Sequence, residues 1–192
     1  MAYSKLLQVH FLFLLLCISI CFVMRNVSIS VSLPPTRRVG QLDKVAEGLS
    51  NAGYKAMARV IRSTFPTLLE EHNFNKSSVM TIFCPTDYAF VGREQPPSLG
   101  LLEYHVVPWK LEKEDLESLI PVGSEIDTLL HGRPLVVRRC ERAYSLSALL
   151  NDVKIKKWNV YNDGNVIVHG VCQFFNPSFD TSRYHRCLFV DC

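Results

Sequence analysis

Residues 81–90 read TIFCPTDYAF and place a strand and a tight turn in the middle of the chain. The first half continues the apolar, β-rich run VMTIFC, which predicts a buried strand over 79–84. Pro85 then turns the chain, and Thr86 or Asp87 can cap a short helix that follows. Phenylalanine rings stand on both sides of the turn, so we expect both to be buried in the core.

Two amphipathic helices precede this strand. Apolar residues recur at helical spacing over 39–50 and again over 54–61, which predicts two helices. Asn51-Ala52-Gly53 stops the first helix. We expect Phe65-Pro66 to end the second, because proline restricts the residue before it. The pair forms a helical hairpin whose apolar faces have to be buried against another layer.

Strands dominate the second half of the chain. Residues 98–107 predict a helix that enters a strand, and residues 113–119 predict a polar helical turn. Further strands are predicted over 127–130, 135–139, 153–161 and 166–171. The Asp163-Gly164 pair between the last two predicts a hairpin. Helices first and strands later, without strict alternation, indicate an α+β domain.

Three segments resemble the signatures of fasciclin-type domains. TIFCPTDYAF resembles the first signature, LLEYHVVP at 101–108 resembles the Tyr-His segment, and 166–177 resembles the closing segment with its apolar pair before proline. They occur in the family's order, after a helical hairpin like the family's own. The chain is thus similar, over 39–180, to single-domain plant fasciclin-like arabinogalactan proteins. The resemblance implies a fasciclin-type domain, with N-terminal helices packed on a mostly antiparallel β-wedge or sandwich.

Three departures from the family pattern limit what the resemblance implies. Cys172 stands where the closing segment usually has an acid, which suggests a disulfide particular to this subgroup. The Ala/Ser/Thr-Pro clusters that carry arabinogalactan chains in relatives are absent, because Pro34-Pro35 and Pro96-Pro97 are too few. The apolar C-terminal tail that signals a lipid anchor is missing too, so no lipid anchor is expected at the C-terminus.

Residues 1–32 have the pattern of a signal peptide. Lys5 precedes the apolar run FLFLLLCISICFVM at 11–24, which fits the core of a signal peptide better than a spanning helix. Counting from Leu6 lengthens the apolar stretch to about nineteen residues, so an uncleaved membrane anchor is the alternative. Residues 33–38 are expected to be a linker and 181–192 a C-terminal tail. The mature chain is predicted to be secreted into the apoplast or cell wall.

Cysteines and glycosylation sequons fit an exported protein. Cys17 and Cys21 lie in the signal, and the rest of the chain holds five disulfide candidates: Cys84, Cys140, Cys172, Cys187 and Cys192. Five cysteines allow two bridges and leave one thiol, and the pairing stays open. Cys84, inside an apolar strand, is alternatively a buried hydrophobe. The Asn75-Lys76-Ser77 sequon predicts glycosylation at Asn75, whereas Asn26 is a site only where the signal is uncleaved.

Tyr104, His105 and Trp109 are the candidate binding residues. In animal relatives the Tyr-His segment has been associated with integrin binding, but plants lack integrins, so that role is not carried over. The other interpretation is that Tyr104 and His105 are core residues, each with a buried hydrogen-bond partner. Trp109 follows Pro108 and is expected to be exposed, where an indole can stack on sugars. Trp158, within its strand, is expected to pack in the core.

Charge and motifs exclude several classes of function. The net charge of +3 is too small for a typical nucleic-acid binder. The chain lacks the motifs of serine hydrolases, zinc proteases, phosphate loops and dinucleotide sites, so no catalytic residue, metal ligand or cofactor is expected. The chain is predicted to be an extracellular adhesion or cell-wall matrix module that binds wall glycans or proteins. The alternative is a carrier or receptor for a small apolar ligand in a pocket between helices and sheet.

Overall fold

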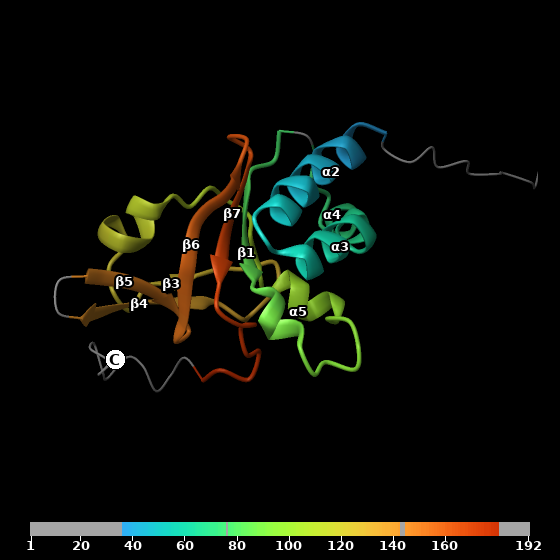
Figure 1. Ribbon diagram of the computed structural model, residues 1–192. Helices are drawn as coiled ribbons and strands as arrows, with labels where there is room; N and C mark the ends of the chain where they lie inside the picture. Colours follow the sequence, from blue (N-terminus) through green and yellow to red (C-terminus); the bar gives the residue numbers. More distant parts are fainter. Residues whose placement is uncertain (1–35, 76, 143–144, 181–192) are drawn as a thin grey trace, which may run out of the picture. The chain divides into compact units, whose positions relative to one another are not determined.

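The computed structural model describes residues 36–75, 77–142 and 145–180 (Figure 1). The helices are α2 (Thr36–Asn51), α3 (Lys55–Ser63), α4 (Phe65–Glu71) and α5 (Leu99–Glu103), with short helical turns η1 (Asp87–Phe90) and η2 (Asp115–Leu119). The strands are β1 (Met80–Pro85), β2 (Val106–Val107), β3 (Glu125–Ile126), β4 (Leu135–Arg142), β5 (Ser145–Leu150), β6 (Val153–Asn162) and β7 (Val166–Val171). The α+β class predicted from the sequence is confirmed.

The N-terminal helices follow the predicted hairpin with two differences. Helix α2 begins at Thr36, inside the stretch expected to be a linker. Gly53 then reverses the chain with a φ of +93°, which glycine adopts without strain. Helix α3 ends at Ser63, just before Phe65-Pro66 as predicted, but these two residues also begin a further helix, α4. Proline is tolerated there since a first-turn residue needs no intrahelical N–H bond.

The described strands form one sheet in the order β2-β1-β7-β6-β5-β4-β3. Among them, β1 and β7 are the one parallel pair, with Met80 opposite Val166 and Pro85 opposite Val171. The predicted hairpin at Asp163-Gly164 joins β6 to β7. The mostly antiparallel arrangement implied by the fasciclin resemblance is thus confirmed.

Two features of the sheet differ from the sequence prediction. The prediction of a strand over 127–130 is wrong, because β3 ends at Ile126. The Thr128 hydroxyl then donates to the carbonyl oxygen of Arg133 at 2.9 Å, which holds a turn where the strand was expected. Strand β5 has no counterpart among the predicted strands. The residues between Arg139 and Ser145 include no glycine, proline, asparagine or aspartate to mark a turn.

Both faces of β1 are buried, and this explains its continuous apolar sequence. Met80, Ile82 and Cys84 pack with α2, α3 and α4 in one core cluster. Phe83 points the other way and packs with side chains of β4, β5 and β7 in a second cluster. Figure 1 shows the helices on one side of β1 and β7, with β4 and β5 running crosswise on the other. The sheet is therefore bent into a wedge that closes the second core.

Candidate functional site

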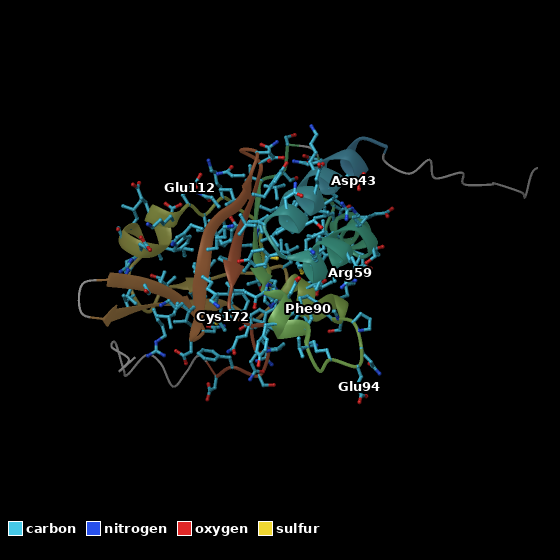
Figure 2. The ribbon with its side chains drawn as sticks, in the orientation of Figure 1. Asp43, Arg59, Phe90, Glu94, Glu112 and Cys172 are labelled. Atoms are coloured by element: carbon cyan, nitrogen blue, oxygen red, sulfur yellow. The ribbon has the colours of Figure 1, made fainter. Side chains whose placement is uncertain are left out.

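The three signature segments meet in an aromatic cluster beyond the carboxyl ends of β1 and β7. Phe175 stacks on the imidazole of His105 with ring centroids 4.4 Å apart, and Phe174 meets His105 edge-on at 5.4 Å. Phe90 packs edge-on against Phe174 at 4.9 Å, and Figure 2 shows it close to α5. Such edge-on and stacked contacts are favourable between aromatic rings. The cluster therefore ties together η1, the Tyr-His segment and the segment after β7.

The candidate binding residue His105 is fully buried. Its Nδ1 lies 2.8 Å from the carbonyl oxygen of Phe83, and its Nε2 lies 3.1 Å from the backbone nitrogen of Phe175. Because Nε2 accepts from the Phe175 N–H, the ring proton is assigned to Nδ1, which donates it to Phe83. Burial lowers the pKa of His105 to about 3, although the hydrogen bond to Phe83 opposes this shift. His105 is thus a neutral residue that joins β1 to the segment after β7.

The neighbouring candidate, Tyr104, is also in the core, with 1% of its surface exposed. Its hydroxyl accepts from the side-chain amide of Asn151 at 2.5 Å and donates to the carbonyl oxygen of Pro134 at 3.3 Å. Burial raises the pKa of Tyr104, so the phenol keeps its proton. Asn151 itself has a φ of +47° and accepts from the Val136 N–H at 2.8 Å. Tyr104 therefore supports the turn that joins β5 to β6.

The two tryptophans differ in exposure. Trp109 has 37% of its surface exposed, and its carbonyl oxygen accepts from the Thr81 hydroxyl at 2.9 Å. The Thr81 hydroxyl oxygen also accepts from the Leu111 N–H at 2.9 Å, so β1 holds the loop at Trp109 and again just after it. Trp158 in β6 is partly buried and meets the His169 ring edge-on at 4.9 Å. Of the three candidate binding residues, Trp109 is the one that the structure places at the surface.

His169 in β7 is a second buried histidine, and no sequence motif marks it as a candidate binding residue. Its Nε2 donates to the carbonyl oxygen of Leu111 at 2.9 Å, and its Nδ1 accepts from the Asn159 N–H at 3.1 Å. Asn159 has a φ of +47° in the irregular part of β6. Burial lowers the pKa of His169. The sequence signal is a histidine within the apolar strand VIVHGV, where a buried polar side chain needs partners.

Acid should destabilise the domain through these two histidines, because the folded-state pKa of each lies below that of an unfolded histidine. The stability they contribute is complete above pH 6.5 and is lost as the pH falls toward the folded pKa, about 3 for His105. From pH 7.5 to pH 5, His105 alone should lower the free energy of unfolding by about 2 kcal/mol. Urea unfolding at several pH values in this range measures the change. A free energy of unfolding that stayed constant would contradict it.

Asp87 links the first signature to the helices. The expectation that Thr86 or Asp87 caps η1 is wrong, since neither side chain bonds to that turn. The Asp87 carboxylate instead accepts from the backbone N–H groups of Lys55 at 3.1 Å and Ala56 at 2.8 Å. These are free donors at the start of α3, where a carboxylate is stabilising. Thr86 donates its hydroxyl to the carbonyl oxygen of Cys172 at 3.0 Å, which joins the turn to the end of β7.

The sequon residue Asn75 is exposed in the loop between α4 and β1. Its Oδ1 accepts from the Ser77 N–H at 3.0 Å and from the Ser77 hydroxyl at 3.1 Å. The first of these bonds closes an Asx turn. The Ser78 hydroxyl donates to the same oxygen at 3.2 Å. The turn thus engages the amide oxygen and leaves the amide nitrogen, the atom that carries an N-linked glycan, outside these bonds.

Two of the five candidate disulfide cysteines have described side chains. Cys84 is fully buried, and burial raises the pKa of its thiol. Cys172 is partly exposed, and the two sulfurs are free thiols in the described part of the chain. Cys84 packs as a small hydrophobe, as the alternative interpretation of the sequence expected. The Cys140 side chain, Cys187 and Cys192 lie outside what the structure describes.

The expected signal peptide, with Asn26, and the tail at 181–192 also lie outside the described residues. Within 36–180, apart from the two short gaps, no helix is long and apolar enough to cross a membrane. Over the same residues, no three His, Cys, Asp or Glu side chains come together in a group that could hold a metal ion.

A pocket of about 610 Å³ opens beside the aromatic cluster. Its wall comes from 93–96 and Ser98 after η1, from Leu101 of α5 and from 174–177 after β7. The Arg93 guanidinium lies over the Phe174 ring, 4.4 Å from its centroid, which is a cation–π contact. The volume falls in the range of about 300–1,000 Å³ that is typical of small-molecule sites. The pocket therefore lies between the loop after η1 and two of the segments that carry the family signatures.

The fasciclin domain model matches residues 52–177, well over half of the chain. The chain therefore belongs to the fasciclin domain family. It is similar to the fasciclin-like arabinogalactan protein 20 of Arabidopsis thaliana, with 29% identity over 134 residues. That match covers 70% of this chain and 30% of the relative, so this chain spans less than a third of the relative's length.

A solved structure supports the fold. The FAS1 domain pair of the insect cell adhesion molecule fasciclin I is similar with a TM-score of 0.50 and 14% sequence identity. The match covers 66% of this chain and 46% of the insect chain. The fasciclin-type fold implied by the three signature segments is thereby confirmed.

Proposed function

We propose that this chain is an extracellular cell-adhesion or cell-wall matrix module that acts by binding and not by catalysis. It binds wall glycans, or an extracellular or cell-surface protein, through surface complementarity. One observation carries the proposal: the Tyr-His signature belongs to the core, while the exposed Trp109 stands on a loop that β1 holds in place. An aromatic side chain on a fixed loop is a typical contact residue, because little conformational entropy is lost on binding.

The buried histidines support a non-catalytic role. His105 and His169 use both ring nitrogens for hydrogen bonds to the backbone, so neither offers a free nitrogen to a substrate. General acid–base catalysis by histidine needs a nitrogen within reach of the reacting group and a pKa near the working pH. His105, with its pKa of about 3, meets neither condition.

Replacing Trp109 by alanine should weaken binding to cell-wall material at least tenfold and leave the fold intact. The exposed part of the indole supplies contact area, and the buried part should make the free energy of unfolding fall by about 1–3 kcal/mol, which leaves the domain folded. Binding of the secreted chain to immobilised wall polysaccharide fractions and to intact cell surfaces measures the first effect. Urea unfolding measures the second.

Tyr88→Ala is the matched control for Trp109→Ala. Tyr88 is 83% exposed on η1, after the Pro85 end of β1, whereas the Trp109 loop is bound to Thr81 near the opposite end. The Tyr88 variant should bind as the unmodified chain does. If no wall fraction or cell surface retains the unmodified chain, the adhesion function fails. If Trp109→Ala binds with unchanged affinity, the contact assigned to Trp109 fails.

An extracellular role requires that the chain is exported and that its domain folds outside the cell. We propose that residues 1–32 direct export as a signal peptide, with an uncleaved anchor as the alternative, and that 39–180 form the fasciclin domain. Disulfides are proposed among four cysteines: Cys140, Cys172, Cys187 and Cys192. Cys84 is set apart from them because its side chain is fully buried against the helices.

We propose that Asn75 carries an N-linked glycan, because its sequon is exposed and folded into an Asx turn. Ser77→Ala should remove the glycan, which the intact mass of the secreted chain would show as the loss of the glycan's mass. We expect the free energy of unfolding of the unglycosylated chain to change by less than about 1 kcal/mol. Ser78→Ala is the matched control, since it removes a neighbouring hydroxyl and keeps the sequon. An unmodified Asn75 in the secreted parent chain would contradict the proposal.

The second candidate, a carrier for a small apolar ligand between helices and sheet, has less support. The described side chains in that interface pack as a closed core, in which Leu49, Ile61 and Ile82 are fully buried. The pocket of about 610 Å³ lies elsewhere, and its wall includes the charged residues Arg93 and Glu94. Charged groups in the wall disfavour an apolar ligand, because it would desolvate them without pairing.

A further inference from the structure

We propose that the pocket walled by 93–96, Ser98, Leu101 and 174–177 binds a sugar that carries a carboxylate group, and that Arg93 binds this carboxylate. The inference rests on the adhesion function proposed above and names the chemical class of one ligand. The site is separate from Trp109. The Trp109 loop is tied to Thr81, whereas the pocket lies beyond the Pro85 end of β1, which is four residues or about 13 Å from Thr81 along an extended strand.

Arg93 has the features of an anion-binding residue. Among the described residues, no carboxylate forms an ion pair with its guanidinium. The Phe174 ring lies beneath it at 4.4 Å and restricts the side chain. Stacking on an aromatic face leaves the N–H groups at the guanidinium edge to bind a carboxylate through two parallel hydrogen bonds. An arginine that is already restricted loses less entropy on binding than a freely moving one.

The rest of the wall supplies groups that sugars use. Gln95 and Asn176 contribute amides, Ser98 contributes a hydroxyl, and two prolines contribute apolar surface. The Oδ1 of Asn176 accepts from the Ser178 N–H at 3.0 Å, which fixes the side chain and leaves its NH2 group as a donor. Amides and hydroxyls can donate to and accept from sugar hydroxyls. The apolar surfaces can cover the C–H face of a sugar ring.

The pocket stands on a rigid base. Phe174 and Phe175 both contact the buried imidazole of His105. The Phe175 N–H is bonded to His105 Nε2, and His105 Nδ1 is bonded to Phe83 in β1. The part of the wall that follows β7 is therefore anchored to strand β1 through ring contacts and two hydrogen bonds. Such preorganisation favours binding because the site has little freedom left to lose.

Glu94 narrows the kind of anion that fits. It lies in the same wall as Arg93, and Figure 2 shows its side chain at the outer end of the loop, directed away from the ribbon. An acidic peptide has a carboxylate on every residue and no hydroxyl that could donate to the Glu94 carboxylate, so it would be repelled. A sugar acid has one carboxylate on each ring, which Arg93 can bind, and neutral hydroxyls on the same ring that can donate to Glu94. A sugar acid can therefore pair with the Arg93 guanidinium and also donate hydrogen bonds to the Glu94 carboxylate.

Titration of the full secreted chain with a trimer of galacturonic acid, followed by calorimetry, tests the proposal. The trimer should bind, and its methyl ester, which keeps the rings and loses the charge, should bind at least tenfold more weakly. Arg93→Gln should weaken binding of the acid at least tenfold. Arg59→Gln is the matched control: it removes the same charge from an exposed position on α3 (Figure 2) and should leave the affinity unchanged.

Three results would overturn the proposal: no binding of the acid trimer, equal binding of its methyl ester, or unchanged affinity after Arg93→Gln. A triglutamate peptide that binds as tightly as the sugar would overturn the choice of a sugar. These failures are distinct from a failure of the adhesion function. If wall fractions retain the chain in a Trp109-dependent manner while the acid trimer does not bind, this inference fails and the proposed function stands.

Discussion

The His105→Ala variant should lose about 4 kcal/mol of its free energy of unfolding at pH 7.5. Two separate losses produce this effect. The carbonyl oxygen of Phe83 and the N–H of Phe175 would each lose a hydrogen-bond partner in a region without water contact. The rings of Phe174 and Phe175 would also lose the imidazole on which they pack, which leaves a cavity in the core.

Urea unfolding of the purified domain, followed by circular dichroism, measures this loss. His131→Ala is the control, because His131 is exposed in the turn before β4 and should change the free energy of unfolding by about 0.5 kcal/mol or less. The His105 variant should also show a weaker pH dependence between pH 7.5 and 5, since one buried neutral histidine is gone. A loss below about 1 kcal/mol would show that His105 does not hold the core together.

Gly170→Ala should lower the free energy of unfolding by about 3 kcal/mol, although it adds a single methyl group. A Cβ at position 170 in β7 would lie 2.6 Å from the Cζ of Tyr54 and closer still to the phenol oxygen. Tyr54 is itself buried. Its ring packs across β7 at position 170, where glycine has no side chain that would occupy this space. The ring would have to move away from the sheet and pull the start of α3 with it.

Gly40→Ala provides a control with the same chemical change and the opposite sign. Position 40 lies in α2, where an added Cβ meets no atom within 4 Å, so alanine should stabilise the helix by about 0.5–1 kcal/mol. A Tyr54→Leu background should remove much of the Gly170→Ala penalty, because the clashing ring is absent. If the two substitutions destabilised the domain additively, Tyr54 would not be the source of the penalty.

The parts of the fold set by local chemistry can be predicted from the sequence. Gly53 and Gly164 have positive φ values and mark the turns that the sequence predicts there. The role of Pro66 is ambiguous in the sequence, because proline is common both just after the end of a helix and in the first turn of a new one. The packing of α4 against the core decides that a new helix begins there. Strand β5 carries no turn residue at its start, so its existence depends on pairing with β4 and β6.

The candidate site depends on contacts between distant residues, which spacing does not reveal. Asp87 caps a helix that begins 32 residues before it, and His105 bonds to a backbone N–H 70 residues after it. The sequence identifies His105 as a polar residue in an apolar run and offers the core as one interpretation, but it does not name the backbone partners. Arg93 belongs to no motif and Phe174 to the closing segment, and their contact appears only when the loop after η1 and the segment after β7 come together.

The parallel pairing of β1 with β7 has a consequence for how the protein is made. Met80 pairs with Val166, which is synthesised about 86 residues later. At ~5–20 residues per second of synthesis, β1 is therefore made roughly 4–17 s before its partner strand β7. During that time β1 has an unpaired strand edge, and its Phe83 face lacks the second core. Helices α2 to α4 are synthesised first and can cover the other face. A nascent chain with such an exposed apolar edge is prone to aggregate, so its yield depends on chaperones that bind during those seconds.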